Sequence, residues 1–223
     1  QLKVMIAKYY IPSGRCIQAL NYSDRNDDGS VGTIADSLKT EYKTRNGRSV
    51  WDGGGVNPDI ELEPRKYSNI LGSIMSKRHI FDFANQFYRE HENIVSPQEF
   101  VVEDVLYDSF ASYLEDKEYE YETRTEKAIK KMEKDAEKDQ YSVDLQIEID
   151  ALKAKMESSK TNDLARFQEE ISEVIEGEIV TRYYFQNGRI EAAIKHDEEI
   201  AKAIEVLNDT EMYNAVLEGT YQE

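Results

Sequence analysis

The apolar pattern of this 223-residue chain changes near Lys66. Before that point, short runs rich in Val, Ile and Tyr alternate with turn residues, and seven of the eleven glycines and three of the four prolines fall there. Beyond it, apolar residues recur with a period of about 3.6, which is typical of amphipathic helices. The sequence therefore predicts an α+β fold, with a short β segment at residues 1–66 and a mainly α-helical domain at residues 67–223.

Within the first part, we expect short strands separated by turns. Residues 2–11 predict a strand that ends at the turn of residues 12–14, and residues 16–20 predict a second. After Val50 and Trp51, the run of residues 52–55 predicts a tight turn. The alternating pair Ile60 and Leu62 then predicts a last edge strand.

The second part contains one long helical pattern at about residues 162–185. Its apolar side chains share one face, four glutamates (169, 170, 173 and 176) take the other, and Asn187-Gly188 is a stop signal. We expect the glutamates to form a solvated face. Other helices are predicted near residues 70–87, 104–114 (with Asp104 as cap), 145–156, 200–207 and 212–217.

Residues 123–138 predict a helix of a different kind. The segment is charged almost all round, with only Ile129 and Met132 to bury. We therefore expect a solvated helix that is supported by ion pairs such as Glu126 with Lys130.

The charge of the chain narrows the classes of partner. The net charge is −17, and all of the net acidity lies beyond residue 66, because residues 1–66 carry ten basic and nine acidic side chains. A polyanion would be repelled, which disfavours nucleic acid and anionic lipid.

No run approaches the roughly 18 apolar residues of a membrane span, so we expect no membrane insertion in this segment. The start lacks the pattern of a signal peptide and lacks Met, so we expect a piece of a longer chain.

One loop has the spacing of a calcium site. Residues 24–31, which begin at Asp24 and include Asp28, place oxygen-bearing side chains at positions one, three and five and a glycine at six. Ala35 stands where a bidentate glutamate is expected, and a strand-like segment precedes the loop. A polar turn is therefore favoured over calcium, and we assign no metal ligand.

No motif of nucleophilic catalysis or cofactor binding is present. Ser13 fits a turn, and the single cysteine, Cys16, fits a small apolar strand residue that can form neither an internal disulfide nor a thiolate cluster. The glycines at 53–55 are not followed by a helix with Lys-Ser or Lys-Thr. The histidines, which are His79, His91 and His196, have no second ligand at i+4. We expect no catalytic, cofactor-binding or metal residue, and no cofactor.

Two segments resemble a known family. Residues 7–18 (AKYYIPSGRCIQ) and, after an insertion, residues 55–60 (GVNPDI) are similar to the end of the catalytic domain of carboxyl-terminal processing peptidases, also called tail-specific serine proteases. The acidic tail, with residues 182–184 and 197–207, resembles the C-terminal extension of members from the Bacteroides group. By this resemblance, residues 1–66 are the end of the protease core.

The resemblance implies a serine endopeptidase that cuts polypeptides near their C-termini with a serine nucleophile and a lysine base. Both family motifs lie upstream of Gln1, and Ser13 and Lys8 belong to the later strand-turn motif. The chain alone is therefore expected to be inactive, and its parent to act on polypeptides in the periplasm or cell envelope. The unpaired edge of residues 2–11 is expected to favour a homodimer. The alternative is a helical interaction or dimerisation module without a catalytic role.

Overall fold

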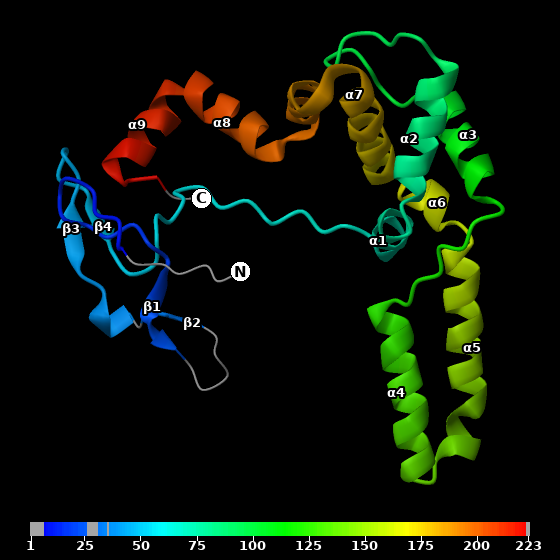
Figure 1. Cartoon of the computed structure of the whole chain (residues 1–223). Coiled ribbons are helices and arrows are strands. Elements are labelled where there is room, and N and C mark those ends of the chain that lie inside the picture. Colours follow the sequence, from blue (N-terminus) through cyan, green and yellow to red (C-terminus); the bar gives the residue numbers. More distant parts are fainter. Residues whose placement is uncertain (1–6, 26–30, 35, 222–223) are drawn as a thin grey trace. The chain divides into compact units, whose positions relative to one another are not determined.

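A computed structural model describes residues 7–25, 31–34 and 36–221 (Figure 1). By its contacts the chain divides into two compact units. The terminal unit comprises Gln1–Glu63 and Glu198–Glu223, and the central unit comprises Pro64–Asp197. Short strands followed by many helices confirm the predicted α+β class. The expected domains, 1–66 and 67–223, stay a prediction, but residues 198–223 group with the terminal unit by contact.

The terminal unit contains two small antiparallel sheets. Strand β1 (Leu20–Arg25) pairs with β2 (Val31–Thr33), and β3 (Glu41–Lys43) pairs with β4 (Ser49–Trp51). A 3₁₀ turn, Asp36–Leu38, separates the two sheets along the chain. The helices α8 (Glu198–Asn208) and α9 (Thr210–Glu218) complete the unit (Figure 1).

Helix α9 is held to the first part of the chain by one arginine. Arg48 follows the β3–β4 turn; its guanidinium donates to the carbonyl oxygen of Val216 at 2.9 Å and forms an ion pair with Asp59. Gly219 ends α9 with a φ of 75°, and a Cβ there would lie 3.1 Å from the Arg48 side chain. The last helix of the chain therefore packs on the strand region and not only on its sequence neighbours.

Several strand predictions were wrong. The turn predicted at residues 12–14 is confirmed, with hydrogen bonds from Ile11 N to Arg15 O and from Gly14 N to Ile11 O. Residues 16–20 are not a strand, because the chain is irregular after Cys16 and β1 starts only at Leu20. Among residues 7–19 a single isolated bridge joins Tyr10 to Cys16; residues 2–6 lie outside the described part. Ile60 and Leu62 lie in irregular chain, where the flanking prolines at 58 and 64 remove backbone donors.

The helical predictions for the central unit were mostly confirmed. Its core is formed where α1, α2, α3 and α7 pack together, with Phe110, Ile175 and Ile179 fully buried. The elements are α1 (Asn69–Ser76), α2 (His79–Glu90), α3 (Asp104–Leu114), α4 (Arg124–Lys138), α5 (Ser142–Lys160), α6 (Asp163–Arg166), α7 (Gln168–Ala193) and the 3₁₀ turn η2 (Ile194–His196).

Two helices differ from their predicted limits. Arg78, with a φ of 63°, separates α1 from α2 within the predicted helix of residues 70–87. The long helix breaks at Phe185 (φ 57°, ψ −157°), where its predicted range of residues 162–185 ends, but Asn187-Gly188 is not a stop, because helical chain resumes after the kink and continues to Ala193. Gly188 is buried, and a Cβ there would clash with the Tyr184 side chain and lie 3.3 Å from Pro97 Cγ. This glycine therefore permits close packing instead of ending the helix.

Helices α4 and α5 form an antiparallel hairpin, seen side by side in Figure 1. Thr123 caps α4 through a reciprocal capping box with Glu126. Ile129 is buried as expected, but Met132 is 40% exposed. The predicted pair was also wrong: the Lys130 ammonium lies 2.6 Å from Glu122, and Glu126 pairs with Lys160 of α5 at 3.1 Å.

Candidate functional site

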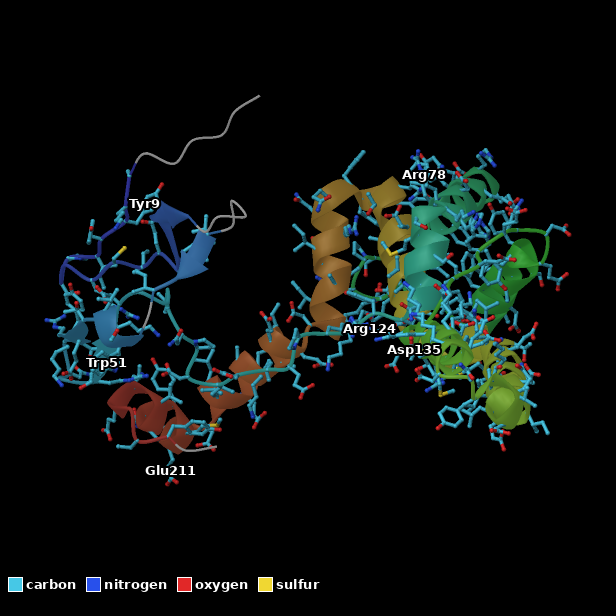
Figure 2. All side chains as sticks on the ribbon, turned by 90° about the horizontal axis from the view of Figure 1, so that it is seen from below. Tyr9, Trp51, Arg78, Arg124, Asp135 and Glu211 are labelled. Carbon is cyan, nitrogen blue, oxygen red and sulfur yellow. The ribbon has the colours of Figure 1, made fainter. Side chains whose placement is uncertain are left out.

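In the terminal unit, Arg15 connects the two segments that carry the family resemblance. Its Nε donates to the carbonyl oxygen of Trp51 at 2.8 Å, and its terminal nitrogen donates to that of Gly55 at 3.1 Å. Trp51 is labelled in Figure 2. Gly55 has a φ of 81°, and a Cβ there would lie 3.2 Å from Ala19 Cβ. The segments of residues 7–18 and 55–60 are therefore neighbours in space although about 40 residues apart along the chain.

The chain bends at the glycine run, where a tight turn was predicted. Gly53 has a φ of 79°, and a Cβ there would lie 3.1 Å from the Ile34 side chain. The Asp52 carboxylate, just before the run, accepts a hydrogen bond from Thr40 N at 2.7 Å. These contacts give the glycines a packing role, and the chain after them continues without a helix until α1.

The candidate nucleophiles and bases are not brought together. Lys8 and Ser13 are both exposed, and the Cys16 thiol lies 3.9 Å from Gln18 Oε1. No base lies within hydrogen-bond distance of the Ser13 hydroxyl in the part of the chain that the structure describes. The calcium-like spacing cannot be followed, since residues 26–30 and Ala35 lie outside the described residues.

The histidines occupy three separate environments. His79 Nε2 lies 2.9 Å from the carbonyl oxygen of Glu118, and the His91 ring stacks on Phe87 with centroids 3.9 Å apart. His196 lies beside α7. Within the described residues, no group of three or more His, Cys, Asp or Glu side chains is arranged to hold a metal ion.

Three of the four glutamates expected on a solvated face of α7 form a line of polar contacts instead, while Glu169 is exposed as expected. Glu170 accepts from Ser68 N, the N-cap of α1, at 3.1 Å. Glu173 lies 2.5 Å from the Arg65 guanidinium, and Glu176, which is only 4% exposed, lies 2.7 Å from the Lys195 ammonium. A helical wheel could not show this, because the partners lie outside the helix.

This line joins the segment that enters the central unit to the segment that leaves it. Arg65 lies on the segment that enters the unit, and His196 lies on the segment that leaves it. Both contact Glu173, with His196 Nδ1 3.7 Å from Glu173 Oε1. His196 Nε2 lies 3.4 Å from Glu176 Oε1 without hydrogen-bond geometry. A cavity of about 480 Å³ adjoins these groups. The arrangement is suited to holding the two ends of the central unit together.

A larger cavity of about 700 Å³ lies where the α4–α5 hairpin meets the core. The Lys160 ammonium lies in its wall, donates to the carbonyl oxygen of Tyr121 at 2.6 Å and lies over the Tyr121 ring. The Tyr121 hydroxyl donates to the buried Asp163 carboxylate. Burial, and then the Asp163 carboxylate, raise the pKa of Tyr121. These polar groups satisfy one another, so they fix the position of the hairpin and leave no free catalytic group among themselves.

The central unit is thus a helical domain in which polar side chains connect segments that are distant along the chain. The family model described as "Probable PDZ-protease, C-terminal helical domain" matches residues 70–207, from α1 into α8. This is more than half of the chain, and the chain belongs to that family: it is a C-terminal part of a protease. A search of curated proteins and a search of solved structures each found no match. In the described residues, no helix is long and apolar enough to cross a membrane.

Proposed function

We propose that this chain is the C-terminal portion of a serine endopeptidase of the carboxyl-terminal processing type, resembling members from the Bacteroides group. The match to the helical domain of a probable PDZ-protease is the observation that carries the proposal. The contacts of Arg15 add support, because they join the two segments that resemble the end of that catalytic domain. The substrate is a polypeptide that is cut near its C-terminus, and the parent acts in the periplasm or cell envelope.

In this proposal the serine nucleophile and the lysine base come from a preceding part of the parent polypeptide. A lysine base requires a depressed pKa, which needs a buried or electrostatically suited site. Lys8 is exposed, and Ser13 lies on an exposed turn. The chain by itself is therefore inactive, and neither residue takes part in the parent's chemistry.

The test begins with the sequence that precedes Gln1 in the parent, read for a serine motif and a Gly-Lys-Gly-x-Val-Gln motif. The purified parent is then given a labelled peptide whose C-terminus is either free or amidated. Substitution of the upstream serine or lysine by alanine should abolish cleavage, whereas Ser13→Ala and Lys8→Ala should retain it. Cleavage by the 223-residue chain alone, or its loss in Ser13→Ala, would contradict the proposal.

A second candidate function is a helical interaction module that selects partners while chemistry occurs elsewhere. The exposed apolar side chains of the hairpin favour it, since Val143 is 87% and Ile147 is 80% exposed. In the parent, residues 64–197 would be replaced by a flexible linker, and residues 198–223 would be kept because they pack in the terminal unit. Loss of all turnover would assign the central unit a role in catalysis, and loss of only some substrates would assign it a role in selection.

A further inference from the structure

The α4–α5 hairpin has a small core of its own. Ile129 and Ala136 of α4 and Ile149 of α5 are the buried apolar residues in these two helices. An amphipathic helix normally buries three to four apolar residues in every two turns. Helices of 15 and 19 residues therefore have fewer buried apolar contacts than their length would provide.

Three of the apolar side chains outside this core lie along one flank of the hairpin. Met132 is 40%, Leu145 39% and Tyr141 60% exposed. Together with Ala128 and Ala136 they line a groove of about 410 Å³ between the two helices. Leu152, 46% exposed, lies seven residues after Leu145 and so on the same side of α5. The groove is therefore an apolar surface to which both helices contribute.

The rim of this groove carries both signs of charge. Lys131 and Asp135 lie one turn apart on α4, and both line the groove, as does Asp139 at the end of the helix. Asp135 is labelled in Figure 2. Asp135 lies 3.7 Å from the Lys138 ammonium, in an exposed pair that contributes little to stability. A partner that presents the same two charges in reverse order would complement this rim.

We propose that the partner is a second copy of this chain, whose hairpin packs on the groove and completes a four-helix bundle. In a twofold interface both copies use the same surface. If one residue contacts a second residue of the other copy, the same contact therefore occurs again with the two copies exchanged. If the two α4 helices cross in antiparallel directions, each Lys131 meets the other copy's Asp135. The apolar side chains of both grooves then cover one another, as in the core of a bundle.

This inference does not depend on the proposed function, because it uses only the surface of the hairpin. It also differs from pairing through the edge of residues 2–11. Val143 and Ile147 belong to another surface, since Ile147 is two residues from Ile149 and so on the opposite side of α5 from α4. These two residues provide a control on the same helix.

The first experiment is sedimentation velocity of the full 223-residue chain over a range of concentrations, with far-UV circular dichroism to verify the helices. The wild-type chain should form dimers. Leu145→Lys places a charge in the centre of the interface in both copies and should weaken association by roughly thirtyfold or more. The matched variant Ile147→Lys should dimerise like the wild type.

The second experiment is a charge exchange on the rim. Asp135→Lys places two positive charges where Lys131 and Asp135 stood, leaves Asp139 as the acidic residue of the lining, and should weaken the dimer, more so at low salt. Adding Lys131→Asp to that variant restores opposite charges only when the two positions face each other in two copies of the same chain. The double variant should therefore recover the dimer, which a different partner or another surface would not produce.

Three results would overturn the proposal. A wild-type chain that stays monomeric at high concentration would show that the groove does not bind a second copy. A dimer disrupted by Ile147→Lys but not by Leu145→Lys would place the interface on the opposite face of α5. A dimer unaffected by Asp135→Lys and by Leu145→Lys would place it outside the hairpin.

Discussion

The buried ion pair between Glu176 and Lys195 should contribute measurably to the stability of the central unit. At 2.7 Å, the Coulomb attraction is about 6 kcal/mol for an effective dielectric constant of about 20, and desolvation of the carboxylate offsets much of it. Glu176→Gln keeps a hydrogen-bond acceptor, and Lys195 is already about a quarter exposed to water. We therefore expect the free energy of unfolding to fall by about 2–3 kcal/mol. Lys195→Met removes the ion pair of a carboxylate that is only 5% exposed, together with the Lys195 hydrogen bond to Phe100 O, and should lower the free energy of unfolding by about 3–4 kcal/mol.

The assay is urea unfolding followed by far-UV circular dichroism on both single variants and the double variant. The double variant should lose less stability than the two single variants together, with a coupling free energy of about 2 kcal/mol. Glu133 and Lys153 supply the control, since their charged atoms are equally close at 2.6 Å but the side chains are 38% and 41% exposed. Their coupling should not exceed about 1 kcal/mol. Equal couplings for the two pairs would refute the argument that burial is what makes the first pair matter.

Three further predictions concern the central unit. Thr123→Ala removes the side-chain cap of α4 and should lower the free energy of unfolding by about 1 kcal/mol in the same urea assay; no change would show that the cap is not formed. Gly188→Ala adds a Cβ against Tyr184 and should destabilise by about 1–3 kcal/mol despite the better helix propensity of alanine, and a gain in thermal stability would contradict the packing described. Because the pKa of Tyr121 is raised, the folded state keeps its proton when the unfolded state loses it, so stability should fall as pH rises above about 10, and Tyr121→Phe should flatten that fall. An equally steep fall in the variant would assign the effect to other groups.

The sequence identified most helices well because their apolar residues recur with the helical period; α4 is the exception, since it was predicted from its charge pattern. The pattern through Ile171, Ile175 and Ile179 predicted a buried face, and all three are fully buried. The period could not show where the backbone departs from helical geometry. Arg78 and Phe185 adopt a positive φ within predicted helices, and neither residue type signals such a conformation.

The polar contacts were harder to predict, because they depend on chain segments distant in sequence. Glu173 and Glu176 have the spacing of a solvated face, and only the fold brings Arg65 and Lys195 to them. Likewise, Glu126 has a good local partner in Lys130 but pairs with Lys160 of the neighbouring helix. The motif segments of the terminal unit were recognisable from sequence, but their contact through Arg15 was not.

The order of the two units along the chain has a consequence for limited proteolysis. The central unit is inserted into the terminal unit, so its polypeptide is covalently continuous with that unit at both Pro64 and Asp197. A single cut in either connection would leave the central unit attached by the other. After a cut near Pro64, the two fragments should still migrate together under native conditions, because residues of both make up the terminal unit, with Arg48 of one bonded to Val216 of the other. Only denaturing gels would reveal such a nick, and release of the helical domain requires both connections to be cleaved.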